Sequence, residues 1–294
     1  MKIKKLISAL VLGSMLVGLS GCNITDFSAE NLLRPPKAVG DEAEIEQLIA
    51  KTADSGYTLK YPKNGKFRSA IIMTDLDGND SNEAVAFFRN SAETSSVHML
   101  VMYSKDNSWE IASDNIFETT DIDSVDFADL TGNGKAEIIV NSTTYTPNVG
   151  KLSCYSYSEG KTNEVGSGQS CSSFVTGDFD NDGTSEIMSL VLYTTENEAL
   201  ASMLDYNEDS KSLYAKAMAN MDPNVVKYKN IAVTKLDNDI TGIVVDGTSA
   251  NEVTNTQVIF YSRDLAILRN PLFKEKAKNI TRRSSQIILS LIHI

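Results

Sequence analysis

A four-fold internal repeat limits the folds open to this chain more than any other feature of its sequence. Four similar segments read TDLDGNDSNEAVAFF, ADLTGNGKAEIIV, GDFDNDGTSEIMSLV and TKLDNDITGIVV. Their first loop positions are Asp75, Asp129, Asp178 and Lys235, so the spacings are 54, 49 and 57 residues. A period of this size is typical of architectures that repeat one supersecondary unit.

A tyrosine followed by a polar turn marks the same unit a second time. These tyrosines are Tyr103, Tyr157, Tyr206 and Tyr261. They lie 28, 28, 28 and 26 residues after the first loop position of their own repeat. The constant offset indicates that loop and turn belong to one structural unit.

Each repeat has the composition of four β-strands. In the first repeat the segments SAIIMTD, EAVAFFR, SVHMLVMYS and SWEIAS are rich in β-branched and aromatic residues and have no helical period. They are apolar nearly throughout, as expected of strands covered on both faces.

We therefore predict an all-β chain, a partial β-propeller of about four four-stranded antiparallel blades over residues 57–270. The blades should start near residues 69, 122, 172 and 229. In each blade the acidic loop should join the first and second strands, and the tyrosine turn should join the third and fourth. The first three loops should then lie on one rim.

The loops carry oxygen ligands at a spacing suited to calcium, which takes six to eight oxygens. The ligands would be the side chains at positions one, three, five and nine and the carbonyl of position seven. Loop three offers Asp178, Asp180, Asp182, Thr184 and Glu186; loop one offers Asp75, Asp77, Asn79, Ser81 and Glu83; loop two offers Asp129, Thr131, Asn133, Lys135 and Glu137. We predict one to three Ca²⁺ sites, with loop three the strongest because it is complete, and loop two the weakest because it has fewer charges.

Other interpretations of the loops are less favourable. Loop four begins with Lys235, whose ammonium cannot ligate a cation, so we predict no metal there. An EF-hand would need Glu at position twelve and flanking helices, whereas that position holds Ala86, Val140 and Ser189. The remaining alternative is an acidic turn closed only by hydrogen bonds of its own side chains, and it applies most to loop two.

These loops resemble the FG-GAP and VCBS repeats of integrin-α-type propellers, whose blades carry D-x-D-x-D-G-x-x-D/E between their first and second strands. From about Cys22 to Arg283 the chain is similar to a group of bacterial lipoproteins with VCBS-type repeats, on the segments LSGC, LLRPPK, YP and FRSAII. The resemblance implies a propeller and a bound cation, and it assigns no activity.

The N-terminus predicts export. A basic MKIKK precedes an uncharged run from Leu6 to Leu19, too short for the roughly 20 residues that span a bilayer, so it fits a signal peptide. The run ends in LSGC, which resembles a bacterial lipobox with Cys22 as the lipidated residue. We predict a signal peptide over 1–21, a tether over 22–40, and lipid anchoring at the extracytoplasmic face of the bacterial cell membrane. A secretory signal with a chance cysteine is the alternative.

Two further segments flank the repeats. Residues 41–56 predict a short amphipathic helix that packs the stripe of Ile45, Leu48 and Ile49 on the main domain. The tail 271–294 ends in LSLIHI, which resembles translated sequencing-adapter sequence. We expect a reading frame truncated near Ser285 and a natural protein with more blades, with a genuine terminal strand as the alternative.

The two remaining cysteines, Cys154 and Cys171, flank the turn YSEGKTNE. In an exported protein they could form a disulfide across adjacent strands, or they could be two free buried thiols. The sequence leaves both open.

Composition and motifs favour binding over catalysis. A net charge of −12 argues against nucleic acid as a partner. The internal histidine His98 lies in an apolar strand without a nucleophile at motif spacing, and Trp109 is expected to pack in its blade. We predict no catalytic residues and a lipid-anchored, calcium-binding surface module for a protein or glycan partner. The alternative is the propeller domain of a polysaccharide-active or other hydrolytic enzyme.

Overall fold

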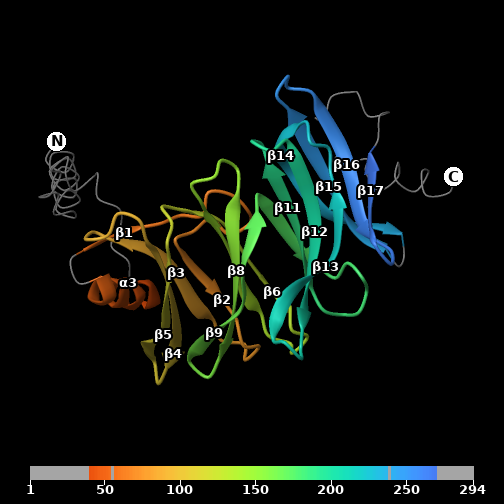
Figure 1. Cartoon of the computed structure of the whole chain (residues 1–294). Coiled ribbons are helices and arrows are strands. Elements are labelled where there is room, and N and C mark those ends of the chain that lie inside the picture. Colours follow the sequence, from red (N-terminus) through yellow and green to blue (C-terminus); the bar gives the residue numbers. More distant parts are fainter. Residues whose placement is uncertain (1–39, 54–55, 238–239, 270–294) are drawn as a thin grey trace, which may run out of the picture. The chain divides into compact units, whose positions relative to one another are not determined.

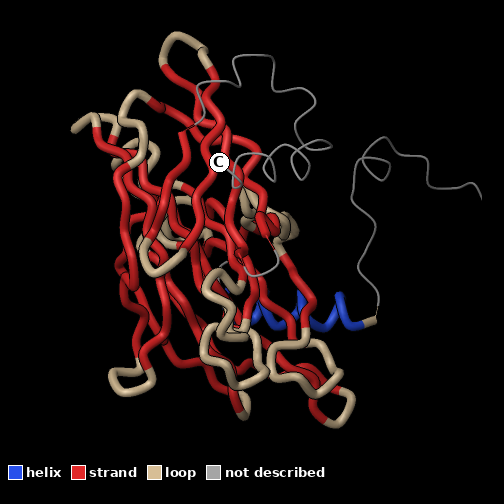
Figure 2. Tube along the Cα trace, turned by 90° about the vertical axis from the view of Figure 1, so that its right-hand side faces the viewer, coloured by secondary structure: helices blue, strands red, loops and turns tan. Residues whose placement is uncertain are grey.

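The described part of the chain is built almost wholly from β-strands. The computed structural model describes residues 40–53, 56–237 and 240–269 of the 294-residue chain. The predicted signal peptide, Cys22, the tether up to residue 39 and the tail from residue 271 lie outside these ranges. Figure 2 shows the strands of the described part and its one helix.

Four antiparallel sheets follow one another along the chain, each a meander of four strands (Figure 1). The first sheet contains β2 (Ile71–Thr74), β3 (Glu83–Asn90), β4 (Val97–Lys105) and β5 (Ser108–Phe117). The second contains β6 (Ile122–Ala128), β7 (Glu137–Thr143), β8 (Gly150–Ser158) and β9 (Lys161–Cys171). The third contains β10 (Ser173–Gly177), β11 (Glu186–Tyr193), β12 (Glu198–Asn207) and β13 (Ser212–Asn220). The fourth contains β14 (Val225–Asp237), β15 (Ile240–Ser249), β16 (Thr254–Tyr261) and β17 (Leu265–Arg269).

This arrangement confirms the predicted all-β class and its four four-stranded antiparallel units. The sheets begin at residues 71, 122, 173 and 225, close to the predicted 69, 122, 172 and 229. Each of the three acidic loops joins the first and second strands of its sheet, and each tyrosine turn joins the third and fourth. None of the sheets in the described residues closes on itself.

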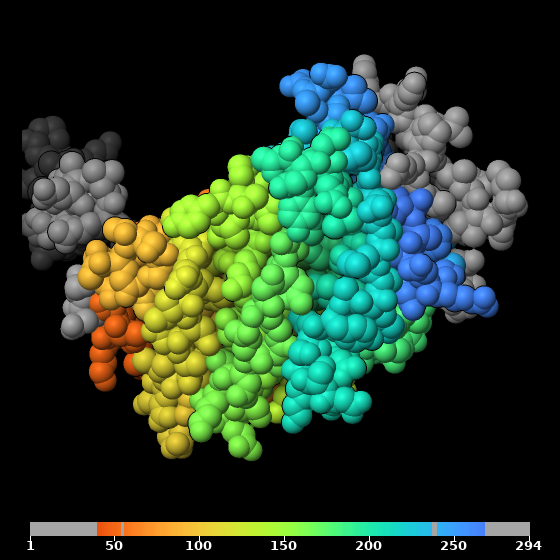
Figure 3. Space-filling view, viewed as in Figure 1, coloured from red at the N-terminus to blue at the C-terminus, as the bar shows by residue number. Residues whose placement is uncertain are grey.

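Successive sheets pack face to face, which explains why the strands are apolar on both faces. One cluster joins the first and second sheets through residues such as Phe87 and Ile138. A second joins the second and third sheets, and a third joins the third and fourth. The space-filling view shows the sheets as neighbouring bands of colour (Figure 3). Since each middle sheet is covered on both sides, the hydrophobic effect stabilises every unit through its neighbours.

The helix α3 (Asp41–Ala53) covers the outer face of the first sheet. Its residues Ile45 and Ile49 are fully buried against Ala84, Phe88 and Leu100 of that sheet. Burial of each isoleucine contributes about 1.5–3 kcal/mol. The helix ends three residues before the predicted position 56, at Ala53.

A short strand that the sequence did not predict follows the helix. Strand β1 (Tyr57–Leu59) pairs antiparallel with the end of β3, so Tyr57 lies opposite Asn90. It extends the first sheet by a fifth strand. Three residues are too few to give a readable alternation of apolar and polar side chains, and the pairing depends on a distant segment.

The two internal cysteines are free thiols, and both are buried. In the pairing of β8 with β9, Cys171 lies opposite Gly150, whereas Cys154 lies opposite Gly166. Gly150, the partner of Cys171, lies four residues from Cys154 along β8. This separation is longer than the roughly 7 Å between Cα atoms that a disulfide allows. The cross-strand disulfide is therefore wrong for this structure, and the alternative of two free buried thiols is correct. Burial raises the pKa of the Cys171 thiol to about 12 and also raises that of Cys154.

Candidate metal centre

The three acidic loops lie side by side, as predicted for one rim. The Ala136 amide in loop two donates to the Leu76 carbonyl in loop one at 3.0 Å. The Ser185 amide in loop three donates to the Asp129 carbonyl in loop two at 2.9 Å. Loop two (129–137) therefore contacts both loop one (75–83) and loop three (178–186).

A buried glutamate at position nine closes each loop in the same way. Glu83, Glu137 and Glu186 are 3%, 1% and 0% exposed. In each, Oε2 accepts a hydrogen bond from the backbone amide of position two: Leu76 at 2.8 Å, Leu130 at 2.8 Å and Phe179 at 2.7 Å. One oxygen of each glutamate is thus used to hold the loop, and the other is left for a second partner.

The aspartate at position one shapes the turn. Asp75 accepts amide hydrogen bonds from Gly78, Asn79 and Asp80, and Asp129 accepts them from Asn133 and Gly134. Position six has a left-handed backbone in all three loops, with φ of 64° at Asp80, 79° at Gly134 and 94° at Gly183. Aspartate tolerates this region better than most side chains, so loop one keeps the turn without the glycine.

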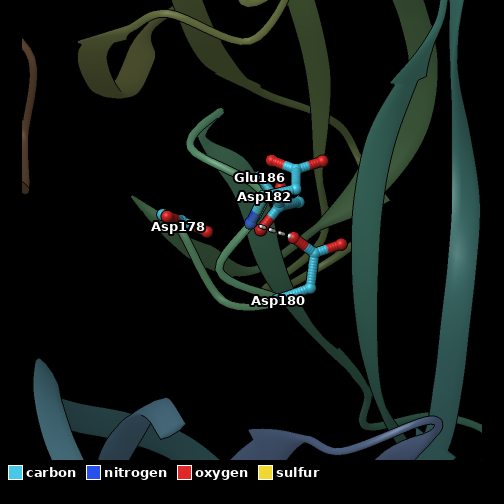
Figure 4. A group of neighbouring side chains, drawn as sticks. All are labelled: Asp178, Asp180, Asp182 and Glu186. Atoms are coloured by element: carbon cyan, nitrogen blue, oxygen red, sulfur yellow. Dashed lines mark hydrogen bonds between the residues drawn. The ribbon is translucent and has the colours of Figure 1, made fainter. Parts of the chain in front are cut away.

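Loop three gathers four carboxylates around one point. One oxygen from each of Asp178, Asp180, Asp182 and Glu186 lies within 4.8 Å of the others. Figure 4 shows these side chains, with the hydrogen bond from the Asp182 amide to Asp180 Oδ1 at 3.1 Å. Asp178 Oδ1 and Glu186 Oε1 are buried and have no hydrogen-bond partner within the described residues. Buried carboxylate oxygens without a partner are costly, so this group is suited to bind a cation or to share a proton.

The electrostatics of Glu186 agree with that geometry. Burial raises the pKa of Glu186 to about 8; the Phe179 amide opposes this shift, and the charges of Asp180, Asp182 and Asp205 add to it. The surroundings of Glu186 thus disfavour its charged form, chiefly because the carboxyl group is buried and further because other carboxylates lie near it. A divalent cation would relieve this repulsion more completely than one proton.

Loop one has the second-best set of ligands. One oxygen from each of Asp75, Asp77 and Glu83 lies within 4.8 Å of the others. Asp77 Oδ1 is buried and has no hydrogen-bond partner in the described part of the chain. Burial raises the pKa of Glu83, although the Leu76 amide opposes the shift. Asn79 Oδ1 accepts a hydrogen bond from the Ser81 amide at 2.7 Å.

Loop two has the same fold but uses its oxygens differently. Its second glutamate oxygen, Glu137 Oε1, accepts a hydrogen bond from Thr131 Oγ1 at 3.3 Å. Asn133 Oδ1 accepts the Lys135 amide at 2.8 Å. Asp129 and Glu137 are its two carboxylates, so this loop fits the hydrogen-bonded turn better than the other two loops do.

In the fourth repeat the two strands that flank loop four come close together in the sequence. Strand β14 continues to Asp237 and β15 begins at Ile240, with Lys235 opposite Thr241. Ile243, at position nine, is fully buried in the cluster between the third and fourth sheets. The apolar pattern of the repeat is thus retained, as predicted, where Lys235 and Ile243 replace the carboxylates of positions one and nine.

Two charged residues beside loop three were missed by the sequence comparison of the repeats. Lys216 of β13 contacts Asp180, and it donates to Asp205 Oδ2 of β12 at 2.7 Å. Neither residue lies in a recognisable motif, and strand pairing brings them to the loop. Tyr157, the tyrosine of the turn in the second repeat, also lies near an acidic loop. Burial raises the pKa of Tyr157 to about 12, and the charges of Glu83 and Asp77 in the preceding repeat add to this shift.

The other candidate residues pack within the first sheet. Trp109 is 8% exposed, in the cluster that includes α3, as expected. His98 is a strand residue whose Nδ1 lies 2.9 Å from Asp114 Oδ1 and whose Nε2 lies 3.1 Å from Glu93 Oε2. Its ring stacks on Phe88 at 4.8 Å between centroids.

A polar groove of about 880 Å³ lies along the first strands of the second, third and fourth sheets. Its walls include the side chains of Asn64, Ser124, Asn141, Thr143, Ser173 and Asn230. Asn141 is 1% exposed, and its Oδ1 has no hydrogen-bond partner among the described residues. The volume is in the range of natural ligand sites.

No protein-family model matches the chain, and no curated protein matches it either. The resemblance to FG-GAP and VCBS repeats therefore rests on the motifs alone. No helix within the described ranges is long and apolar enough to cross a membrane.

Proposed function

We propose that this protein is a lipid-anchored, extracytoplasmic, calcium-binding β-propeller module that binds a glycan or protein partner at the bacterial cell surface. The observation that supports the calcium site is the pair of buried, unpartnered oxygens in loop three, Asp178 Oδ1 and Glu186 Oε1. They belong to a group of four carboxylates whose oxygens lie within 4.8 Å of one another.

The donor set fits calcium by its chemistry. All the candidate ligands are hard oxygens, from carboxylates, an amide and backbone carbonyls, and the loop contains no histidine or cysteine. Asp178, Asp180, Asp182, Glu186 and the Thr184 carbonyl would hold an ion in loop three. Asp75, Asp77, Asn79, Glu83 and the Ser81 carbonyl would hold one in loop one. The ion would neutralise the carboxylates and stiffen the rim on which the loops lie.

The polar groove supports a glycan as the partner. Hydroxyl and amide side chains line it, and such groups exchange hydrogen bonds with the hydroxyls of a sugar. A protein partner at the same groove remains the second candidate for the ligand class.

Thermal unfolding in calcium and in chelator tests the metal site. Calcium at millimolar concentration should raise the melting temperature of the parent protein, because the ion binds the folded state alone. The double variant Asp178→Asn/Asp180→Asn should lose most of that rise. The exposed pair Asp106→Asn/Asp209→Asn changes the net charge equally and should keep it. An unchanged melting temperature of the parent in calcium would refute the site.

Membrane anchoring is tested separately. The variant Cys22→Ser should remain an unlipidated precursor and should move from the detergent phase to the aqueous phase on extraction, because the acyl chains would be missing. Unchanged partitioning would show that the attachment does not run through Cys22.

A further inference from the structure

Loop three differs from the other two loops by a lysine that is ion-paired with one of its carboxylates. Lys216 Nζ donates to Asp180 Oδ2 and, at 2.7 Å, to Asp205 Oδ2. The side chains of Lys216, Asp180 and Asp205 are 24%, 9% and 11% exposed, so this is a mostly buried ionic group. Asp180 supplies position three of the proposed calcium site, and a lysine already occupies one of its oxygens.

A β-bulge directs Lys216 to this place. In the pairing of β12 with β13, Leu204 lies opposite Ala215 and Met203 lies opposite Ala217. Lys216 is the extra residue between these pairs. A bulge of this kind re-aims a side chain and is often found beside functional sites.

The same bulge occurs between the third and fourth strands of the first and second sheets. The extra residues there are Ala112 and Val165, as the register shows. Both pack in the apolar clusters between neighbouring sheets. In the third sheet the corresponding place holds Lys216, whose ammonium lies 6.0 Å from the centre of the Tyr261 ring of the fourth sheet.

Lys216 is the one lysine paired with two carboxylates, Asp180 and Asp205, among the ion pairs of the described residues. Two such neighbours favour the charged form of a lysine. Within the described residues no ion pair with a lysine or arginine involves the carboxylates of loop one or loop two. Loop three therefore combines the most carboxylates with a cation of its own.

We propose that Lys216 sets the calcium affinity of loop three by competing with the ion for Asp180. The ammonium neutralises part of the carboxylate group in the metal-free protein. To ligate calcium, Asp180 Oδ2 would have to leave the lysine, which would keep its hydrogen bond to Asp205. The two cations would still lie close together and repel each other, so the lysine would weaken calcium binding. This inference rests on the proposed calcium site and adds how that site is regulated.

The consequence is an affinity matched to the surroundings of an exported protein. A loop with four carboxylates and no internal cation would stay filled at low calcium. Competition shifts its affinity toward the roughly 10⁻⁴–10⁻³ M range of extracellular calcium modules. Occupancy of loop three would then follow the calcium concentration outside the cell.

Calcium titration by calorimetry tests this on the full chain with loop one inactivated by Asp75→Asn/Asp77→Asn. In that background, Lys216→Met should bind calcium on the order of tenfold more tightly, because the competing charge is gone. Lys216→Arg keeps the charge and should match the background protein. Lys151→Met removes an exposed charge on the second sheet and should also match it. Circular dichroism shows whether each variant folds.

The outcomes separate this inference from the calcium site itself. If the background protein binds calcium and Lys216→Met binds it equally or more weakly, the lysine does not compete and the inference is overturned. If no variant binds calcium, the proposed site falls and the inference falls with it. If Lys216→Met does not fold, the double variant Asp205→Asn/Lys216→Met removes the carboxylate left unpaired, and the same tighter binding is expected.

Discussion

Loop three and loop two have the same framework and different chemistry. In both, a buried glutamate at position nine accepts the amide of position two, and position six is left-handed. The second glutamate oxygen is unpartnered in loop three, whereas Thr131 donates to it in loop two. The framework thus depends on one glutamate oxygen, and the candidate metal site would use the other.

The loop framework of the repeat and the candidate metal site are therefore separable features. The framework recurs wherever the position-nine glutamate is present, because a buried amide must be satisfied whether or not an ion binds. The candidate metal site adds carboxylates at positions three and five, Asp180 and Asp182 in loop three. In loop four the strands persist although Lys235 and Ile243 replace the carboxylates of positions one and nine.

The largest effect on stability should come from truncation of the position-nine glutamates of loops two and three. Glu137→Ala and Glu186→Ala should each lower the free energy of unfolding by about 1–3 kcal/mol, because each leaves a buried amide without its acceptor. Glu186→Ala alone should also abolish the calcium-dependent gain in stability at loop three. Urea unfolding with calcium and with chelator measures both. Equal calcium responses in the two variants would break the distinction between framework and ligand.

A gain of function should sharpen the comparison. Thr131→Asp places a carboxylate at position three of loop two and removes the hydroxyl that occupies Glu137 Oε1, so its ligands match those of loop one. Calcium affinity of loop two should rise about tenfold, because one more negative charge is added to the site. Calorimetry should detect one additional ion per chain. Thr131→Val, which removes the hydroxyl without adding charge, serves as the control and should add no ion.

A smaller effect should come from the backbone at position six. Asp80→Gly in loop one should raise the free energy of unfolding by about 0.5–1 kcal/mol, because glycine adopts the left-handed region without steric cost. Gly183→Ala in loop three should lower it by at least a similar amount. Chemical denaturation in chelator measures both. A destabilised Asp80→Gly would show that the aspartate side chain is needed for the loop itself.

The smallest effect should be a pH response outside the loops, where carboxylates already have a cation. Burial lowers the pKa of His98, but the hydrogen bonds and charges of Asp114 and Glu93 outweigh it, so the pKa is raised. A raised histidine pKa contributes stability below about 6.5 that is lost as pH rises through the folded value. The stability advantage of the parent over His98→Gln should therefore shrink as the pH rises above about 6.5, equally with and without calcium. A calcium-dependent difference would link this cluster to the rim.

The sequence predicted most of the fold because each repeat carries its own local signals. Strand runs, acidic loops and tyrosine turns recur at a constant offset, and the structure confirms their order. The pairing of β1 with β3 and the separation of Cys154 from Cys171 were not predictable in this way, because both depend on the register between strands.

The candidate site was predictable in its ligands and not in its neighbours. The spacing of Asp178, Asp180, Asp182 and Glu186 already placed four carboxylates together. The double role of Glu186 and the contact of Lys216 with Asp180 appear only when a loop and a bulge meet in space. A loop motif does not predict contacts with side chains from another strand of the sheet.

The most direct measurement is a crystal structure of the protein in calcium, with a terbium soak to locate ions by anomalous scattering. The account predicts an anomalous peak in loop three, with calcium about 2.3–2.6 Å from Asp178 Oδ1 and Glu186 Oε1, the two oxygens that lack partners. A second peak should lie in loop one, and none in loop four. A well-ordered loop three without a peak, with both oxygens satisfied by protein donors or protons, would contradict the proposal of a calcium-binding rim.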